Sequence, residues 1–529
     1  MLDIVIRNAT VVDGTGAKAF QADVGVRGQR IEAIGDLGGA AAGQTLDAAG
    51  LCVSPGFVDM HTHSDLSIME DPRAQSKVRQ GVTIELVGHC GFSPFPLQGK
   101  GATLFRPATY SAHIPDVDWT DLAGYAARIN RQGASIHVAP LVGHVAVRGA
   151  VIGYEDQAPT PAELEAMRRL VAEAMEQGAF GLSTGLTLAP SSYADMEEIV
   201  ALAEVAGRYG GIYDTHARLW DGRHFSASEE AIEVGRRAGV KVQYAHIAII
   251  DPRYQGQAAQ LAALYERANA DGVDAAFDVY PYVAAGTSLS QMLPGWVQSG
   301  GLPAMLDRLR DAATRRRIFE EVNAGWFRGI PWDWKTFYVA SPGAKGDRAW
   351  MGKHLEQLAD DWRVAPAEAF LRIIDISEDG ARVTIFNRTE EDMQVFLRHR
   401  LSTVGSDGSA ISADGPQAQA LVHPRYYGAH ARVLGRYVRE KKLLTLEEAV
   451  HKMTLQPALR LGLRRHGRLA PGYAADLVIF DAGVIADRAT FEQPHQYAVG
   501  VQHVMVNGQW VIRDGEHTGA RPAGVLRRD

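Results

Sequence analysis

Cysteine is scarce in this chain of 529 residues, which holds only Cys52 and Cys90. Two thiols do not supply the disulfide framework of a small secreted domain, so the composition excludes that class and favours a reducing compartment. Long apolar runs are also missing, and none approaches the roughly 18 consecutive apolar residues of a membrane-spanning helix. Residues 1–7 begin a strand-like pattern and lack the basic and apolar regions of a signal peptide. We therefore expect a cytoplasmic protein that does not enter a membrane.

Runs of positive charge are absent too. The 54 Lys and Arg residues are outnumbered by 62 Asp and Glu residues, and the net charge of -8 is spread along the chain. Without a basic stripe, nucleic acid is not an expected partner. The remaining composition, 46% hydrophobic and 22% charged, is that of a globular protein long enough for a large barrel and a smaller domain. The sequence leaves open whether the protein is a monomer or a homo-oligomer.

Strand-like and helix-like segments alternate through the centre of the chain. One of the helical segments covers residues 161–175, with Thr160 at the N-cap position and Pro161 in the first turn. This alternation predicts an α/β fold with parallel strands. Eight strand runs predict a (β/α)8 TIM-like barrel. These runs are 52–59, 82–88, 135–142, 179–183, 211–215, 240–245, 274–280 and 401–405.

The two ends of the chain share a different pattern of short strands and tight turns. Both alternate apolar and polar residues, and Asn507-Gly508 is a strong hairpin signal. Neither end is long enough to bury a good core alone. We therefore expect one small β-sandwich domain built from both termini, residues 1–54 and 466–529, beside a metal-dependent barrel over residues 55–465.

The spacing of the strand runs is broken once. The seventh run ends near Tyr280 and the eighth starts near Leu401, which is far more chain than a βα connection needs. We interpret residues of about 285–395 as an insertion that shapes the substrate pocket, with a peripheral role as the alternative. The insertion contains amphipathic helical segments and a tryptophan-rich patch, Trp326, Trp332 and Trp334.

The most informative short segment is His61-Thr62-His63, which closes an apolar, β-branched run. Residues two apart on a strand point to the same face, so both imidazoles can reach one metal ion from one side. Further residues with metal-binding side chains follow later strand runs, namely Cys90, His216, His246 and Asp407. Because His216 and His246 are one βα unit apart, we expect them to be neighbours on the barrel rim.

All six of these residues fall where strands of the predicted barrel end, and that face carries the active site in (β/α)8 barrels. Imidazole, thiolate and carboxylate are usual zinc ligands, and bound zinc activates water and polarises a carbonyl oxygen. A carboxylate beside the metal can move a proton from that water to a leaving amine. Taken singly, a His or Cys is often structural, as we expect of Cys52, and both interpretations stay open for His144. The ordered set indicates a metal-dependent hydrolase.

Longer phrases accompany the candidate ligands. They are Ser54-Pro-Gly-Phe-Val-Asp-Met-His-Thr-His63, Gln80-Gly-Val-Thr83, Gly88-His-Cys-Gly91, Leu141-Val-Gly-His144, Gly181-Leu-Ser-Thr-Gly185, Pro190-Ser-Ser-Tyr193, Tyr280-Pro-Tyr282, Gly405-Ser-Asp-Gly408, His423-Pro-Arg425 and Arg468-Leu-Ala-Pro-Gly-Tyr-Ala-Ala-Asp-Leu477. Together they resemble the amidohydrolase superfamily and, within it, the D-aminoacylase (N-acyl-D-amino-acid deacylase) family. The resemblance covers almost the whole chain.

This resemblance implies hydrolysis of a small-molecule amide, an N-acyl-D-amino acid, to a carboxylate and a free D-amino acid. It also implies a (β/α)8 barrel with a β-sandwich and an insertion, and it makes Asp407 the general acid/base. One Zn2+ would be tightly bound, by Cys90, His216 and His246. A second, weaker divalent metal would be bordered by His61, His63, Cys90 and Asp407.

Substrate contacts are carried over in the same way. Tyr282 and Arg425 would bind the substrate α-carboxylate, since a guanidinium offers it two parallel donors, and Ser288 would add a hydrogen bond. The sequence departs from the family in three ways. Ala248 stands where the family usually has a lysine, His89 replaces a common asparagine, and the loop between Asp407 and His423-Pro-Arg425 is longer than is typical. We expect the missing lysine to favour a less acidic or bulkier acyl substrate.

Two alternatives stay open. The first is hydrolysis of a cyclic amide, such as a hydantoin, imide or lactam, which need not present a free α-carboxylate to Arg425. The second is a barrel without catalytic activity that serves as a binding or assembly protein. Such relatives usually lose metal ligands, whereas this ligand set is complete.

Overall fold

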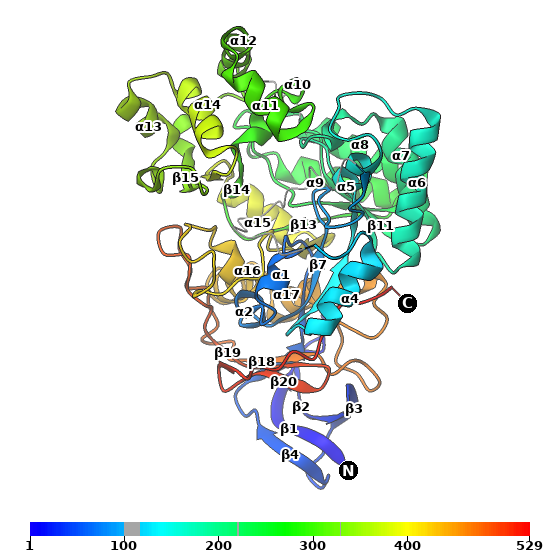
Figure 1. Ribbon diagram of the computed structural model, residues 1–529. Helices are drawn as coiled ribbons and strands as arrows, with labels where there is room; N and C mark the ends of the chain where they lie inside the picture. Colours follow the sequence, from blue (N-terminus) through cyan, green and yellow to red (C-terminus); the bar gives the residue numbers. More distant parts are fainter. Residues whose placement is uncertain (100–116, 220–221, 328, 529) are drawn as a thin grey trace.

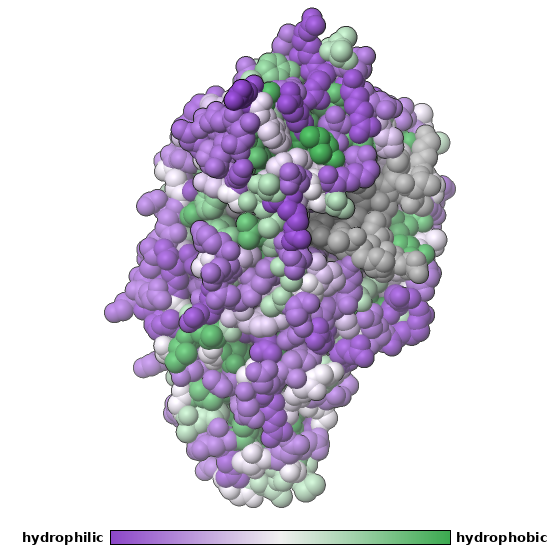
Figure 2. All heavy atoms as spheres, turned by 60° about the vertical axis from the view of Figure 1, so that its left-hand side comes forward, coloured by the Kyte–Doolittle hydropathy of each residue, from purple (hydrophilic) through white to green (hydrophobic). Residues whose placement is uncertain are grey.

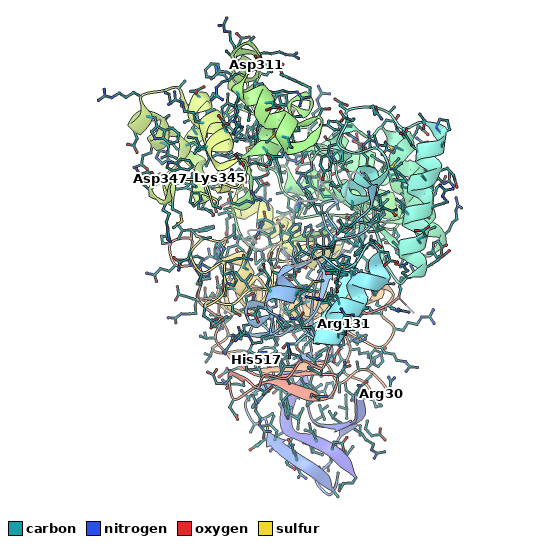
Figure 3. The ribbon with its side chains drawn as sticks, in the orientation of Figure 1. Arg30, Arg131, Asp311, Lys345, Asp347 and His517 are labelled. Atoms are coloured by element: carbon teal, nitrogen blue, oxygen red, sulfur yellow. The ribbon has the colours of Figure 1, made fainter. Side chains whose placement is uncertain are left out.

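The chain is arranged in three parts along its long axis (Figure 1). The computed structural model describes residues 1–99, 117–219, 222–327 and 329–528. Strands from the two chain ends lie at the lower end of the view, parallel strands and their helices lie in the middle, and a group of helices forms the upper end. In the same orientation, Figure 3 places Arg30 near the lower end and Asp311 at the upper one.

One sheet contains strands from both ends of the chain. Its bounds are β1 Leu2–Val11, β2 Phe20–Arg27, β3 Arg30–Gly35, β4 Ala42–Asp47, β5 Cys52–Pro55, β18 Leu477–Phe480, β19 Val501–Val506, β20 Gln509–Arg513 and β21 Glu516–His517. The order is β21-β20-β19-β18-β5-β1-β2-β3, and β4 pairs with β1. The junction is β5, which pairs parallel with β1 and antiparallel with β18.

A second set of strands is parallel and spans the middle of the chain. Its members are β6 Phe57–Asp59, β7 Val82–Val87, β8 His137–Pro140, β9 Val142–Gly143, β10 Gly181–Gly185, β11 Ile212–His216, β12 Lys241–Tyr244, β13 Ala275–Val279 and β17 Ser402–Val404. They pair in the orders β6-β7-β8 and β9-β10-β11-β12-β13-β17. The amide of Met60 donates to the carbonyl of Val404 (3.1 Å), so the first and last of these strands lie side by side.

The predicted strand run 52–59 is divided at Gly56. The half before it belongs to the terminal sheet, and the half after it belongs to the parallel set. A Cβ at Gly56 would stand 2.1 Å from Thr83 Oγ1, so only glycine lets the chain pass this close to β7. Periodicity does not separate the two halves, because both are buried and lack a polar face.

Helices connect the parallel strands and pack against them. Helix α6 begins as predicted, with the Thr160 hydroxyl accepting from the amide of Glu163 and Pro161 in the first turn. The bounds are α1 Ser67–Glu70, α2 Gln75–Val78, α4 Leu122–Gln132, α5 His144–Val151, α6 Pro161–Glu176, α7 Met196–Arg208, α8 His224–Ala238, α9 Ala258–Ala270, α15 Glu390–Arg398, α16 Arg425–Arg432, η6 Val433–Glu440, α17 Leu446–Met453 and α18 Leu455–Leu461.

The segment between β13 and β17 has its own sheet and its own apolar core. Its elements are β14 Ala285–Ser288, α10 Gly295–Gln298, α11 Gly301–Arg310, α12 Ala312–Asn323, β15 Phe337–Ser341, α13 Leu355–Trp362, α14 Pro366–Ser377 and β16 Arg382–Ile385. The sheet order is β14-β16-β15. The rings of Trp332 and Trp334 stack with centroids 3.9 Å apart, and Trp326 stacks on Trp332 at 6.0 Å. The tryptophan-rich patch is therefore mostly core of this segment.

The surface is mainly hydrophilic on the face shown in Figure 2, where hydrophobic residues form small patches separated by polar ones. Within the part of the chain that the structure describes, no helix combines the length and the apolar character needed to cross a bilayer.

Candidate metal centre

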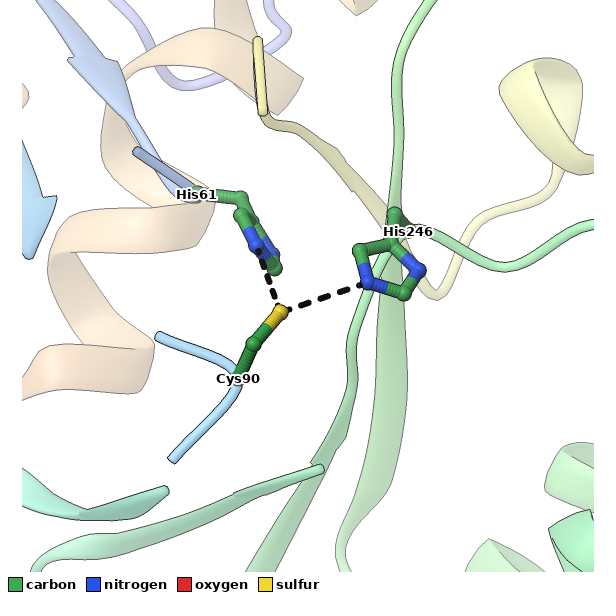
Figure 4. A group of neighbouring side chains, drawn as sticks. All are labelled: His61, Cys90 and His246. Atoms are coloured by element: carbon green, nitrogen blue, oxygen red, sulfur yellow. Dashed lines mark hydrogen bonds between the residues drawn. The ribbon is translucent and has the colours of Figure 1, made fainter. Parts of the chain in front are cut away.

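The side chains of Cys90, His216 and His246 meet at the carboxyl ends of the parallel strands. Cys90 follows β7, His216 is the last residue of β11, and His246 follows β12. The Cys90 sulfur lies 3.7 Å from His216 Nδ1 and 3.5 Å from His246 Nε2, and these two nitrogens are 3.0 Å apart. Figure 4 shows the same sulfur between His246 and His61, whose Nε2 atom lies 3.7 Å away. Four of the six predicted ligands thus share one centre.

The three sulfur–nitrogen distances fit a tetrahedral zinc site. Ligand atoms roughly 2.0–2.3 Å from one zinc ion lie about 3.3–3.8 Å from each other at tetrahedral angles, and the distances from Cys90 fall in that range. The nitrogens of His216 and His246, at 3.0 Å, lie slightly closer to each other than this range. Burial lowers the pKa of His216 to about 4 and that of His246 well below its usual value, so both imidazoles are neutral and offer a lone pair. Spacing and donor chemistry both suit Zn2+.

The remaining predicted ligands stand beside this centre. His63 Nε2 lies 3.1 Å and His61 Nε2 lies 3.8 Å from Asp407 Oδ1, while Arg425 Nη1 lies 2.7 Å from Asp407 Oδ2. Burial by itself would raise the pKa of Asp407, but the Arg425 guanidinium and the two histidines together outweigh burial and hold that pKa well below its usual range. The carboxylate is therefore ionised and faces both the histidine pair and a fixed positive charge.

Buried acids that the sequence analysis did not single out hold the histidines. Asp278 Oδ1 accepts from the backbone amide of His246 (2.8 Å) and lies 3.3 Å from His61 Nδ1. Asp214 lies 3.0 Å from Nδ1 of His89, whose ring stacks on that of His61. Such contacts fix imidazole orientation around a metal. The signal in the sequence was an acid within each of two buried parallel strands, β11 and β13, where a charged residue is rare unless it has a partner.

Three of the candidate ligands have a left-handed backbone. The φ angles are 55° at Cys90, 38° at His246 and 51° at Asp407. Such angles cost about 1–3 kcal/mol for a residue other than glycine and persist where the surroundings fix them, often at functional sites. The loop of Cys90 is fixed closely, because a Cβ at Gly185 would stand only 2.2 Å from the Cys90 carbonyl oxygen. The chain thus turns sharply where these strands end.

A cavity of about 460 Å3 opens beside the cluster. Two of the predicted substrate contacts, Ser288 and Arg425, line it, as does Trp326 of the inserted segment. Of the two tyrosines in the phrase Tyr280-Pro-Tyr282, it is Tyr280 that lines the cavity. The Tyr282 hydroxyl instead donates to Asp487 Oδ2 (3.4 Å). The sequence does not distinguish these neighbours, because both flank Pro281 in the same phrase.

The sequence matches the model of the amidohydrolase family over residues 44–324 and 398–512, which is most of the chain. The chain belongs to the amidohydrolase family. The gap between the two matched ranges falls within the segment inserted between β13 and β17. The matched ranges contain every candidate metal ligand.

Relatives are similar over the full length. The chain is 37% identical to an N-acyl-D-glutamate deacylase of Alcaligenes xylosoxydans xylosoxydans, covering 100% of this chain and 97% of that protein. It is 34% identical to a D-aminoacylase of the same organism, covering 99% and 98%. A crystal structure of N-acyl-D-glutamate deacylase from Bordetella bronchiseptica, complexed with zinc and a phosphonate inhibitor, matches with a TM-score of 0.82 and 32% identity over 99% of both chains.

Proposed function

We propose that the protein is a zinc-dependent hydrolase that cleaves the amide bond of N-acyl-D-amino acids and releases a carboxylate and a D-amino acid. The observation that carries this proposal is the convergence of the Cys90 sulfur with three imidazole nitrogens at 3.5–3.7 Å. The full-length similarity to deacylases of N-acyl-D-amino acids supports the substrate class. On this proposal Cys90, His216 and His246 hold the tightly bound Zn2+. A second, weaker metal position is bordered by His61, His63, Cys90 and Asp407.

When bound there, zinc activates water and polarises the amide carbonyl. Asp407 acts as the base, because its ionised Oδ1 faces the histidine pair. It takes a proton from the attacking water and gives the proton to the amide nitrogen, so that the amine leaves uncharged. Asp278 keeps His61 in place through Nδ1 of its ring and His246 through its backbone amide during this transfer.

Arg425 links substrate binding to the state of this base. We assign it to the substrate α-carboxylate, with Ser288 and Tyr280 beside it on the cavity wall. Before substrate binds, the guanidinium is engaged with Asp407 at 2.7 Å. A second carboxylate on the same guanidinium weakens its hold on Asp407, and the pKa of Asp407 then rises toward that of an effective base.

We further propose that the parallel strands close into one (β/α)8 barrel over residues 55–465, with an insertion at about 285–395. The hydrogen bond between Met60 and Val404 supports closure. The terminal segments, 1–54 and 466–529, would form a separate β-sandwich domain, supported by their shared sheet. Two free, buried thiols support a cytoplasmic location.

The variant Asp407→Asn tests the chemistry, since it keeps the shape of the side chain and removes the base. We expect zinc content, measured by metal analysis, to stay near that of the unmodified protein while kcat falls about 10²–10⁴-fold. Near-normal turnover would refute the role of Asp407.

Substrate class is tested by presenting N-acyl-D-amino acids, N-acyl-L-amino acids and cyclic amides to the zinc-loaded enzyme. Release of amine from the D series supports the proposal. Turnover confined to hydantoins, imides or lactams would overturn it.

A further inference from the structure

Arg388 is a cation of the cavity wall that the proposed reaction does not use. It follows β16 in the inserted segment, where its backbone amide donates to the carbonyl of Val283 (3.3 Å). Its guanidinium carbon lies 4.3 Å from the centroid of the Tyr280 ring. The guanidinium of Arg425 lies 4.8 Å from the same centroid. One aromatic ring thus positions two arginines at the same cavity.

The two guanidiniums differ in their partners. Arg425 is paired with Asp407. Arg388 forms no ion pair within the described residues, and its buried Nε atom has no hydrogen-bond partner there. A third arginine of the wall, Arg382, donates to the backbone carbonyls of Asp379 (2.9 Å) and Ala381 (3.1 Å). Arg388 is therefore a fixed charge on the cavity wall that feels Asp407 at longer range but pairs directly with no carboxylate of the described residues.

A partly desolvated cation of this kind is costly unless an anion completes it, and a guanidinium stays protonated in proteins, so neutralisation by proton loss does not relieve the cost. A substrate carboxylate is the matching group, because it accepts two parallel hydrogen bonds from a guanidinium. Ala248, which lines the same cavity, leaves its own position without charge. The charge that the family usually places as a lysine is thus present on another wall.

We propose that Arg388 is a specificity-determining residue that binds the side-chain carboxylate of an acidic N-acyl-D-amino acid, while Arg425 binds the α-carboxylate. This inference rests on the proposed function. The two guanidiniums are separated by no more than the sum of their distances to one ring, so both can reach carboxylates attached to the same short carbon chain. A carboxylate on the acyl group would lie on the other side of the scissile amide from the α-carboxylate that Arg425 binds.

The test compares N-acetyl-D-glutamate with N-acetyl-D-glutamine, which have nearly the same shape and differ in one charge. We expect the zinc-loaded enzyme to prefer the glutamate derivative. Arg388→Gln should lower kcat/KM for the glutamate derivative about 100-fold, mainly through KM, and change that for the glutamine derivative less than about 3-fold. Arg388→Lys should restore part of the preference. The control is Arg372→Gln, which makes the same substitution at a partly exposed arginine paired with Glu368. It should leave kcat/KM for both substrates unchanged.

Equal losses for the two substrates in Arg388→Gln would overturn the inference, as would a wild-type preference for the glutamine derivative. If no N-acyl-D-amino acid is hydrolysed, the proposed function fails, and calorimetric titration of the same two compounds still decides the role of Arg388. A tighter Kd for the glutamate derivative that disappears in Arg388→Gln supports the inference. A Kd ratio that the substitution leaves unchanged refutes it.

Discussion

A methyl group at position 185 would press on the loop that carries Cys90. Gly185 is the last residue of β10, and a Cβ built there would lie 2.2 Å from the carbonyl oxygen and 2.9 Å from the carbonyl carbon of Cys90. Ordinary contacts of a Cβ begin near 3.4 Å, so the two backbones would have to separate by about 1 Å in Gly185→Ala. Cys90 has little freedom to absorb this shift, because its φ of 55° already lies in the left-handed region.

The size of the effect follows from these contacts. Overpacking of this kind costs about 1–3 kcal/mol of unfolding free energy, which a protein of ordinary stability survives. Displacing a ligand or catalytic group by about 1 Å costs on the order of 100-fold in rate. We therefore expect Gly185→Ala to fold, to bind zinc more weakly in competition with a chelator, and to lose about 100-fold in kcat/KM.

The assay combines urea denaturation, zinc titration against a chelator, and amine release from an N-acyl-D-amino acid. Gly39→Ala is the matched control, since a Cβ at Gly39 meets no atom within 4 Å. It should leave all three measurements unchanged. A Gly185→Ala protein with normal zinc affinity and normal turnover would show that the close approach of β10 does not position Cys90.

Two further predictions concern the buried charges behind the site. Lys77→Met should lower the free energy of unfolding, measured by urea denaturation, by about 3–5 kcal/mol. Lys77 Nζ lies 2.8 Å from Asp59 Oδ2, and its loss leaves a buried carboxylate unpaired. A decrease below about 1 kcal/mol would contradict this. Burial, opposed by Lys77, raises the pKa of Glu85 to about 7 from 4.5, so its contribution to stability is complete below pH 4.5 and is lost as the pH rises through 7. Gln mimics the protonated acid, so the unfolding free energy of Glu85→Gln should rise above that of the unmodified protein by up to about 3 kcal/mol between pH 5 and 8. A difference in unfolding free energy that does not vary with pH would refute the raised pKa of Glu85.

Local patterns were sufficient for some features of the fold. The N-cap of α6 was predicted from Thr160 and Pro161 and is confirmed, because capping depends only on residues within one turn. The convergence of Cys90 with His216 and His246 was also anticipated, since the carboxyl ends of adjacent parallel strands meet on one face.

Other features depend on contacts that no local pattern records. The division of a strand run at Gly56 results from the approach of Thr83, and the choice of Tyr280 over Tyr282 for the cavity wall results from Asp487, far along the chain. Arg388 was missed for the same reason. A single arginine after a strand is usually a solvated residue, and only the packed structure places the Arg388 guanidinium over the ring of Tyr280 on the cavity wall.

The sheet shared by both chain ends has a consequence for biosynthesis. The edge of β5 is completed by β18, which begins at Leu477 and leaves the ribosome long after Pro55. At roughly 5–20 residues per second, the nascent amino-terminal strands wait about 20–85 s for their partner, with an open edge that can pair with other chains. Chaperone binding during translation is therefore expected to matter most for the first fifty or so residues, and truncation from the carboxyl end should produce aggregation rather than a smaller folded protein.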